Sequence, residues 1–249
     1  MSTPLLDPWE VGRRSRLSPL RAALALRRRC EPAWYRRGWQ SDPWHAGAAA
    51  RWPARLLPEE ETALLRLEEI TGSAITPAQA AALLLLARSA PAQGEIVELG
   101  SDRGKSTVAL AWGAQRSAQP CTVHAADPFV DTNPEHRRQR MALLQRHLED
   151  YGAANVSFHP LASGEFRAEY DRPLRLVFVD AAHDYLNSRF DFLAWKELIV
   201  PGGVLAAHDV DNPQWGAGTR QAFFDHVLAD PRFELVLHVD NLAAARRVA

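Results

Sequence analysis

Residues 96–107 read IVELGSDRGKST, an apolar run that stops at a turn with glycine at positions 100 and 104. The turn opens directly onto a helical pattern. Glycine lets the backbone approach a ligand closely, and a helix N-terminus offers free N–H groups. This arrangement is typical of a nucleotide-binding strand, turn and helix, although an ordinary strand-to-helix turn shows the same residues.

The spacing of the glycines argues against two commoner phosphate-binding turns. A P-loop has four residues between its glycines, whereas three separate Gly100 from Gly104. A G-x-G-x-x-G turn needs a second glycine to admit a pyrophosphate, and Ser101 and Asp102 occupy that place. A ligand without a diphosphate therefore fits the turn better.

Further strands follow this turn, separated by helical patterns, which predicts an α/β fold. The second predicted strand ends at Asp127, and an acid at that position suits a ribose diol. The last two predicted strands are joined by a short turn at residues 240–241 and form a hairpin. The predicted strands after the first are 121–126, 155–159, 174–179, 203–207, 233–239 and 242–248.

Acidic residues end two of these strands. Asp180 follows the fourth and Asp209 the fifth, with Asp211 two residues further on. Because ligands in open α/β sheets bind outside the carboxyl ends of the strands, we expect Asp180 and Asp209 at one rim. Carboxylate oxygens suit Mg²⁺ or another divalent cation. The alternative is that these aspartates only cap helices or turns.

Two histidines and a tryptophan accompany the acids. His183 lies three residues beyond Asp180 and is a candidate general base, with a helix-capping or metal-supporting histidine as the alternative. His208 would point to the opposite face from Asp209 if strand alternation continues. Trp215 follows the fifth strand and would either stack on a sugar ring or pack beneath the next helix.

Four sequence blocks give the chain a family resemblance over roughly residues 75–249. They read VELGSDRGKST at 97–107, ADPF at 126–129, VFVDAAHDY at 177–185 and PGGVLAAHD at 201–209. In these blocks the chain resembles the class I S-adenosylmethionine-dependent methyltransferases. It is most similar to the branch of macrocin-type sugar O-methyltransferases and the cephalosporin-biosynthesis protein once called a hydroxylase. The resemblance implies a doubly wound, Rossmann-like, seven-stranded and mostly parallel sheet with an antiparallel C-terminal hairpin.

The resemblance also implies roles for individual residues. It implies that the amino-acid end of S-adenosylmethionine is bound by Glu98, Gly100, Ser101, Gly104, Ser106 and Thr107. It also implies that Asp127 binds the ribose hydroxyls and that the adenine is flanked by Phe129, Ala162 and Ser163. Asp180 borders the donor and acts with His183 in catalysis, and the expected metal ligands are Asp180, Asp209 and Asp211.

These roles predict a divalent-metal-dependent O-methyltransferase that methylates a hydroxyl of a sugar, glycan or glycosylated natural product. A hydroxyl is a poor nucleophile at neutral pH, so a bound Mg²⁺ would lower its pKa and an imidazole would take the proton. One alternative is an NAD-dependent oxidoreductase, which the missing second glycine disfavours. Another is a non-catalytic donor-binding or scaffold protein, against which the joint presence of Asp180, His183 and Asp209 argues.

The overall net charge of −1 hides an uneven distribution. Residues 1–57 hold eleven arginines against four acids, and five of the eight tryptophans. This composition predicts an Arg/Trp-rich N-terminal arm ahead of a methyltransferase domain at 58–249. The arm would cover the domain or a second copy of the chain, or close as a lid over a sugar or an anionic substrate. Nucleic-acid binding is not expected, because no second basic stripe follows.

Two features bear on the compartment. The two cysteines, Cys30 and Cys121, are far apart, which gives neither a disulfide framework nor a zinc spacing. No apolar run is long enough to span a bilayer, and the N-terminus lacks the apolar region of a secretory signal. These observations predict a cytoplasmic protein without a transmembrane segment.

Overall fold

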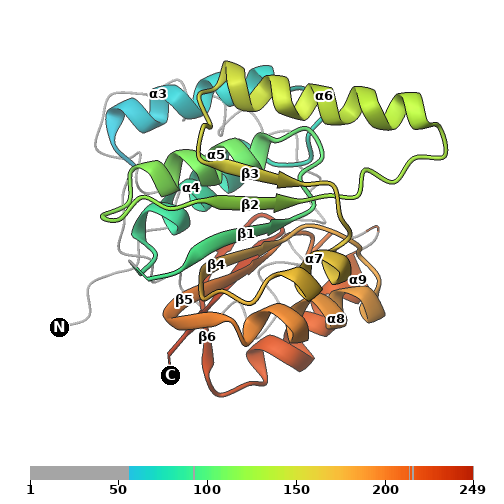
Figure 1. The fold of residues 1–249 in the computed structure, drawn as a ribbon. Helices are drawn as coiled ribbons and strands as arrows, with labels where there is room; N and C mark the ends of the chain where they lie inside the picture. The colour runs from blue at the N-terminus through green and yellow to red at the C-terminus, as the bar shows by residue number, and fades with distance from the viewer. Residues whose placement is uncertain (1–55, 92, 213, 215, 249) are drawn as a thin grey trace.

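The computed structural model describes residues 56–248, except residues 92, 213 and 215. In this part of the chain one seven-stranded sheet lies between two layers of helices (Figure 1). The predicted fold class is therefore confirmed. The predicted arm lies almost entirely outside the described residues, so its boundary at residue 57 stays a prediction.

The strand order is β3-β2-β1-β4-β5-β7-β6. The first five strands along the chain are parallel, and β7 runs antiparallel to both β5 and β6. The order reverses between β1 and β4, which is where open α/β sheets bind ligands. The strands are β1 (Glu95–Leu99), β2 (Val123–Ala126), β3 (Val156–His159), β4 (Leu174–Val179), β5 (Ile199–Ala207), β6 (Phe233–Val239) and β7 (Leu242–Arg247).

The predicted fifth strand, 203–207, is longer in the structure because β5 begins at Ile199. The register between β4 and β5 shifts early in the pairing, and Gly202 there has a φ of 81°. Glycine tolerates this left-handed backbone, so the strand continues through the Pro-Gly-Gly sequence that reads as a turn.

The helices cover both faces of the sheet (Figure 1). Alternate strand residues face opposite sides, so Ile96 packs with α4 and α5 while Val97 packs with α7, α8 and α9. None of the helices in the described part of the chain is long and apolar enough to cross a membrane. The α-helices are α3 (Pro58–Arg66), α4 (Pro77–Ser89), α5 (Lys105–Gln115), α6 (Pro134–Asp150), α7 (Ser163–Glu169), α8 (Tyr185–Lys196) and α9 (Gly216–Phe223).

Helix α4 begins with a capping box that also ties it to the far end of the chain. Thr76 Oγ1 accepts a hydrogen bond from the Gln79 amide at 3.1 Å, and Gln79 Oε1 accepts one from the Thr76 amide at 2.9 Å. Pro77 occupies the first helical position. Thr76 Oγ1 donates to Asp240 Oδ2 at 2.8 Å, which holds the start of α4 against the turn between β6 and β7.

Candidate active site

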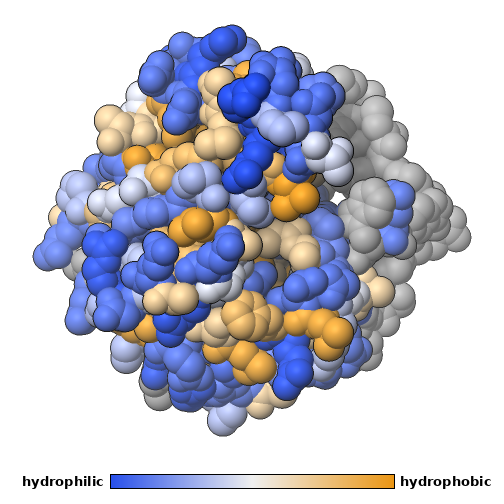
Figure 2. All heavy atoms as spheres, turned by 45° about the vertical axis from the view of Figure 1, so that its right-hand side comes forward, coloured by the Kyte–Doolittle hydropathy of each residue, from blue (hydrophilic) through white to orange (hydrophobic). Residues whose placement is uncertain are grey.

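A cavity of about 950 Å³ opens at the carboxyl ends of the parallel strands. It is lined by the turn after β1, the end of β2, the turn after β3 and the ends of β4 and β5. Figure 2 brings this side of the molecule forward and shows apolar residues around a hollow in a mostly hydrophilic face. The strands and loops that the sequence singles out therefore converge on one cavity.

The glycine turn, residues 100–104, borders this cavity between the ends of β2 and β4. Gly100 has a φ of 90°, and a Cβ atom added there would lie 2.0 Å from the Asp180 carbonyl oxygen. Gly104 has a φ of 84°, and its added Cβ would lie 2.5 Å from Leu144 Cδ1. Gly100 thus requires glycine for both backbone conformation and space, whereas Gly104 requires it mainly for its left-handed backbone, because the end of the Leu144 side chain can shift. Gly100, Ser101 and Ser106 line the cavity, whereas Gly104 does not.

Glu98 lies beneath the glycine turn and does not line the cavity. Its side chain is completely buried and accepts a hydrogen bond from Thr107 Oγ1 at 2.5 Å. Burial raises the pKa of Glu98 to about 7, although the hydroxyls of Ser106 and Thr107 act in the opposite direction. Glu98 and Thr107 therefore support the turn from inside the protein.

Asp127, at the end of β2, is bound to the glycine turn. Its Oδ2 accepts hydrogen bonds from the Ser101 and Asp102 amides, both at 3.0 Å, and its Oδ1 accepts one from the Phe129 amide at 2.7 Å. Asp127 lines the cavity, but the Phe129 ring is fully buried and packs edge-on against Phe158. The structure thus does not bring Phe129 to the surface of the cavity, because its side chain turns into the core.

The turn after β3 brings Ala162 and Ser163 to the cavity, and helix α8 brings Asp191, an acid that was not predicted from the sequence. Ser163 Oγ donates a hydrogen bond to Asp191 Oδ1, and Trp195 Nε1 donates to Ser163 Oγ at 3.0 Å. Asp191 lies on the buried face of α8 with Ser188 and Trp195. The sequence does carry a signal for this residue, because Asp191 lies at the helical spacing of the buried residues of α8, where a charged side chain is unusual.

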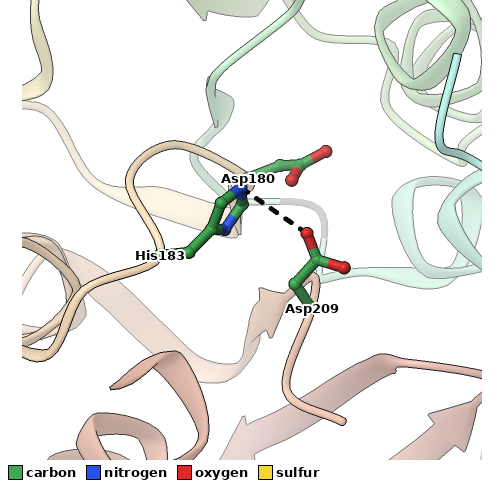
Figure 3. A group of neighbouring side chains, drawn as sticks. All are labelled: Asp180, His183 and Asp209. Atoms are coloured by element: carbon green, nitrogen blue, oxygen red, sulfur yellow. Dashed lines mark ion pairs between the residues drawn. The ribbon is translucent and has the colours of Figure 1, made fainter. Parts of the chain in front are cut away.

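The opposite side of the cavity carries the acidic rim, defined here as Asp180, His183 and Asp209. One ligand atom from each lies within 4.8 Å of the other two, and His183 Nε2 is 3.6 Å from Asp209 Oδ2. Figure 3 shows the imidazole of His183 and the carboxylate of Asp209 facing one another, with the Asp180 carboxylate alongside. The loop after β4 supplies the first two residues, and the end of β5 supplies the third.

His208 contacts both acids of the rim, so the prediction that it points to the opposite face is wrong. Its Nδ1 lies 3.1 Å from Asp180 Oδ1 and 3.4 Å from Asp209 Oδ2. Asp209 has a φ of 57°, which ends the strand alternation on which the prediction depended. Burial opposes the charged form of His208, but attraction by the two carboxylates outweighs it and raises the pKa to about 10.

Asp209 is held by several neighbours. Its Oδ1 accepts hydrogen bonds from Asn212 Nδ2 at 2.9 Å and from Asn241 Nδ2 at 2.5 Å. Burial opposes the ionised form, but the hydrogen bond and charge of His208 outweigh it and keep the pKa of Asp209 below its usual range. The position of this carboxylate is therefore fixed by β5, by the loop that follows and by the β6–β7 turn.

Asp211 lies apart from the acidic rim. Arg220 Nη1 lies 2.7 Å from Asp211 Oδ1, and His238 Nε2 lies 3.1 Å from Asp211 Oδ2. Its side chain is buried in this pair of contacts and does not line the cavity. Of the three expected metal ligands, the structure brings together Asp180 and Asp209 and adds His183. Trp215 lies outside the described residues.

The sequence of the cavity's central strands and loops matches a known family. Residues 97–210 match the family model described as a methyltransferase domain. The chain carries a methyltransferase domain. The match covers β1 through the end of β5, and with the strand order it confirms the class I methyltransferase resemblance and the predicted enzyme class.

Solved structures of methyltransferases share the fold of this domain. TomG, an O-methyltransferase from Streptomyces achromogenes involved in tomaymycin synthesis and solved with SAM, is 20% identical; the match covers 75% of this chain and 90% of TomG, with a TM-score of 0.56. An O-methyltransferase from Bacillus cereus solved with SAH is 21% identical over 76% of this chain and 90% of that chain, with a TM-score of 0.53. CalS11, a TDP-rhamnose 3'-O-methyltransferase of calicheamicin biosynthesis, is 18% identical over 78% of this chain and 96% of CalS11, with a TM-score of 0.52.

Proposed function

We propose that this methyltransferase domain transfers the methyl group of S-adenosylmethionine to a hydroxyl group of a sugar, a glycan or a glycosylated natural product. One observation carries the proposal: the glycine turn and the acidic rim border the same cavity, which is large enough for a nucleoside donor beside an acceptor. The activities of TomG and CalS11 support O-methylation, and that of CalS11 supports a sugar acceptor.

The donor would lie along the strand ends from the glycine turn toward the turn after β3. Gly100, Ser101 and Ser106 would contact its amino-acid end, while Glu98, Gly104 and Thr107 would shape the turn from beneath. Asp127 would accept hydrogen bonds from the ribose hydroxyls. The adenine would reach Ala162 and Ser163, which line the cavity. Phe129 would not contact the adenine, because its ring is buried in the core behind the cavity wall.

A divalent cation fits the chemistry of the acidic rim. Two carboxylates and an imidazole converge there, and oxygen-rich donor sets suit Mg²⁺ with coordination positions left for substrate oxygens. Asp180 and Asp209 would hold the ion, which when bound lowers the pKa of a coordinated hydroxyl. We assign no ligand role to Asp211, whose carboxylate is bound to Arg220 and His238.

His183 is the proposed general base. Its imidazole is one-third exposed and lines the cavity, so an acceptor hydroxyl can approach Nε2 from the open side. Asp209 Oδ2, at 3.6 Å, would stabilise the imidazolium formed when the hydroxyl proton arrives. The deprotonated oxygen would then attack the methyl carbon of the donor, the bond from that carbon to the sulfonium sulfur would break, and S-adenosylhomocysteine would leave. His208, which contacts both Asp180 and Asp209, would hold the two carboxylates in place.

The domain limits remain part of the proposal. We propose residues 58–249 as the methyltransferase domain and residues 1–57 as an arm that covers the acceptor or a second copy of the chain. Removal of residues 1–55 should raise KM for the acceptor or lower the number of chains per particle in sedimentation, while binding of S-adenosylhomocysteine is retained. A truncated chain with the same KM and the same number of chains per particle would contradict the role of the arm.

The decisive test is calorimetric titration of the full chain with S-adenosylhomocysteine and, in parallel, with NAD, each with Mg²⁺ and after chelation. Saturable binding of S-adenosylhomocysteine without NAD binding supports the donor and justifies an acceptor screen with TDP-sugars. Binding of NAD alone, or of neither ligand, would overturn the proposal. Mg²⁺-dependent turnover with a methylated hydroxyl as product would then support the metal and the acceptor class.

A further inference from the structure

The mechanism leaves one buried acidic residue of the cavity without a role. Asp191 on α8 is 3% exposed and lines the cavity beside the turn after β3. In the described part of the chain no Lys, Arg or His forms an ion pair with it. A buried carboxyl without a counter-ion is costly to keep unless a hydrogen-bond donor meets it. Because Asp191 lines a ligand cavity, a bound ligand is a candidate to donate that hydrogen bond.

The protein binds one oxygen of this carboxyl. Ser163 Oγ donates to Asp191 Oδ1, and Trp195 Nε1 fixes the serine hydroxyl by donating to it at 3.0 Å. No other hydrogen bond reaches the carboxyl in the described residues, so Oδ2 is left for a group in the cavity. Burial raises the pKa of Asp191 to about 6, despite the hydrogen bond from Ser163.

The position of Asp191 indicates which part of a donor it would meet. The glycine turn and Asp127 lie at the ends of β1 and β2, and the turn after β3 continues the same edge of the sheet. A nucleoside whose ribose meets Asp127 therefore extends its base toward Ser163. Phe190 also lines the cavity there, and its ring is 3.4 Å from where a Cβ on Gly164 would lie. This ring offers an apolar cover for the base.

We propose that Asp191 selects adenine as the base of the donor, with Oδ2 accepting a hydrogen bond from the exocyclic amino group. This inference rests on the proposed function, since it assumes that an S-adenosyl donor occupies the cavity. Ser163 and Trp195 are positioning residues in this arrangement, because they direct Oδ1 away from the base and leave Oδ2 toward it.

The test compares S-adenosylhomocysteine with its 6-deamino analogue, in which unsubstituted purine replaces adenine. Titration calorimetry of the full chain at pH 7.5 should show the analogue binding about tenfold more weakly or worse, as expected for loss of a hydrogen bond to a charged group. In Asp191→Ala the ratio of the two dissociation constants should fall to about one. Asp191→Leu, similar in size and suited to a buried position, should give the same ratio if the alanine variant does not fold. Asp171→Asn changes an exposed acid outside the cavity and should keep the wild-type ratio.

A purely structural role for Asp191 gives a different result. If Asp191 only braces Ser163, both ligands weaken equally in the variants and the wild-type ratio is retained, which overturns the inference. A wild-type ratio near one also overturns it while leaving the proposed function standing. Failure of the wild type to bind S-adenosylhomocysteine at all would instead overturn the proposed function.

Discussion

The glycine turn and the acidic rim border the same cavity but are built by different forces. The turn depends on backbone conformation and close packing, since Gly100 has no room for a Cβ and Asp127 binds three backbone amides around it. The rim depends on charge, with two carboxylates facing His183 and His208. Substitutions in the turn should therefore act mainly on stability, whereas substitutions in the rim should act mainly on the reaction.

The largest expected effect is on turnover, from Asp209→Asn. Asparagine tolerates the left-handed backbone of this position, where φ is 57°, so the fold should survive. Loss of the charge removes a proposed metal ligand and the partner of His183. We expect the rate to fall by about a thousandfold, within the range for lost acid-base and metal assistance. Product formation at saturating Mg²⁺ and the thermal melting point, measured together, check this expectation.

Asp211→Asn is the matched control for that variant. The Asp211 carboxylate contacts Arg220 and His238 at 2.7 and 3.1 Å and is absent from the group at the rim. Its loss should lower the melting temperature while turnover stays within about threefold of wild type. A loss of Mg²⁺-dependent turnover as large as that of Asp209→Asn would show that Asp211 is the third ligand after all.

The second effect, on stability, comes from Gly100→Ala. A Cβ atom there would lie 2.0 Å from the Asp180 carbonyl oxygen, at a φ of 90°. We expect the free energy of unfolding to fall by at least about 3 kcal/mol, because strain and overlap add. Gly152→Ala is the control: its φ is 66°, but no atom lies within 4 Å of the added Cβ. That variant should lose about 1 kcal/mol in urea unfolding. Equal losses would mean that backbone strain alone governs the turn.

These two regions also differ in how far the sequence predicts them. The glycine turn and the strand ends at Asp127, Asp180 and Asp209 follow from local patterns, because apolar runs and glycine positions set the local backbone. The side-chain partners do not. His208 reaches Asp180 because of one left-handed residue at the end of β5, and Asp211 pairs with a residue of β6 that is distant in sequence. Strand alternation and spacing carry no information about such contacts.

The third effect depends on pH and concerns the inner side of the glycine turn. Burial raises the pKa of Glu98 from 4.5 to about 7, so the folded protein keeps its proton where the unfolded chain has lost it. Between pH 4.5 and 7 the unfolded state therefore binds fewer protons, and the free energy of unfolding falls as the pH rises. Glu98→Gln should remove this loss and be more stable than wild type by up to about 3 kcal/mol at pH 8. Urea unfolding of both proteins from pH 4.5 to 8 checks it, and parallel profiles would show that Glu98 ionises normally.

The smallest effect links the support of the rim to the start of α4. Thr76 caps the helix through the Gln79 amide and donates to Asp240 in the β6–β7 turn, whose Asn241 holds Asp209. Thr76→Ala loses both hydrogen bonds and should lower the free energy of unfolding by about 1 kcal/mol. Thr76→Ser keeps the hydroxyl and should stay close to wild type. Asp209 keeps its contacts with Asn212 and His208 in the alanine variant, so turnover should stay close to that of wild type although the free energy of unfolding falls. A large fall in turnover in Thr76→Ala, with only this small loss of stability, would mean that the position of the Asp209 carboxylate depends on packing at the start of α4. The rim would then depend on packing as the glycine turn does.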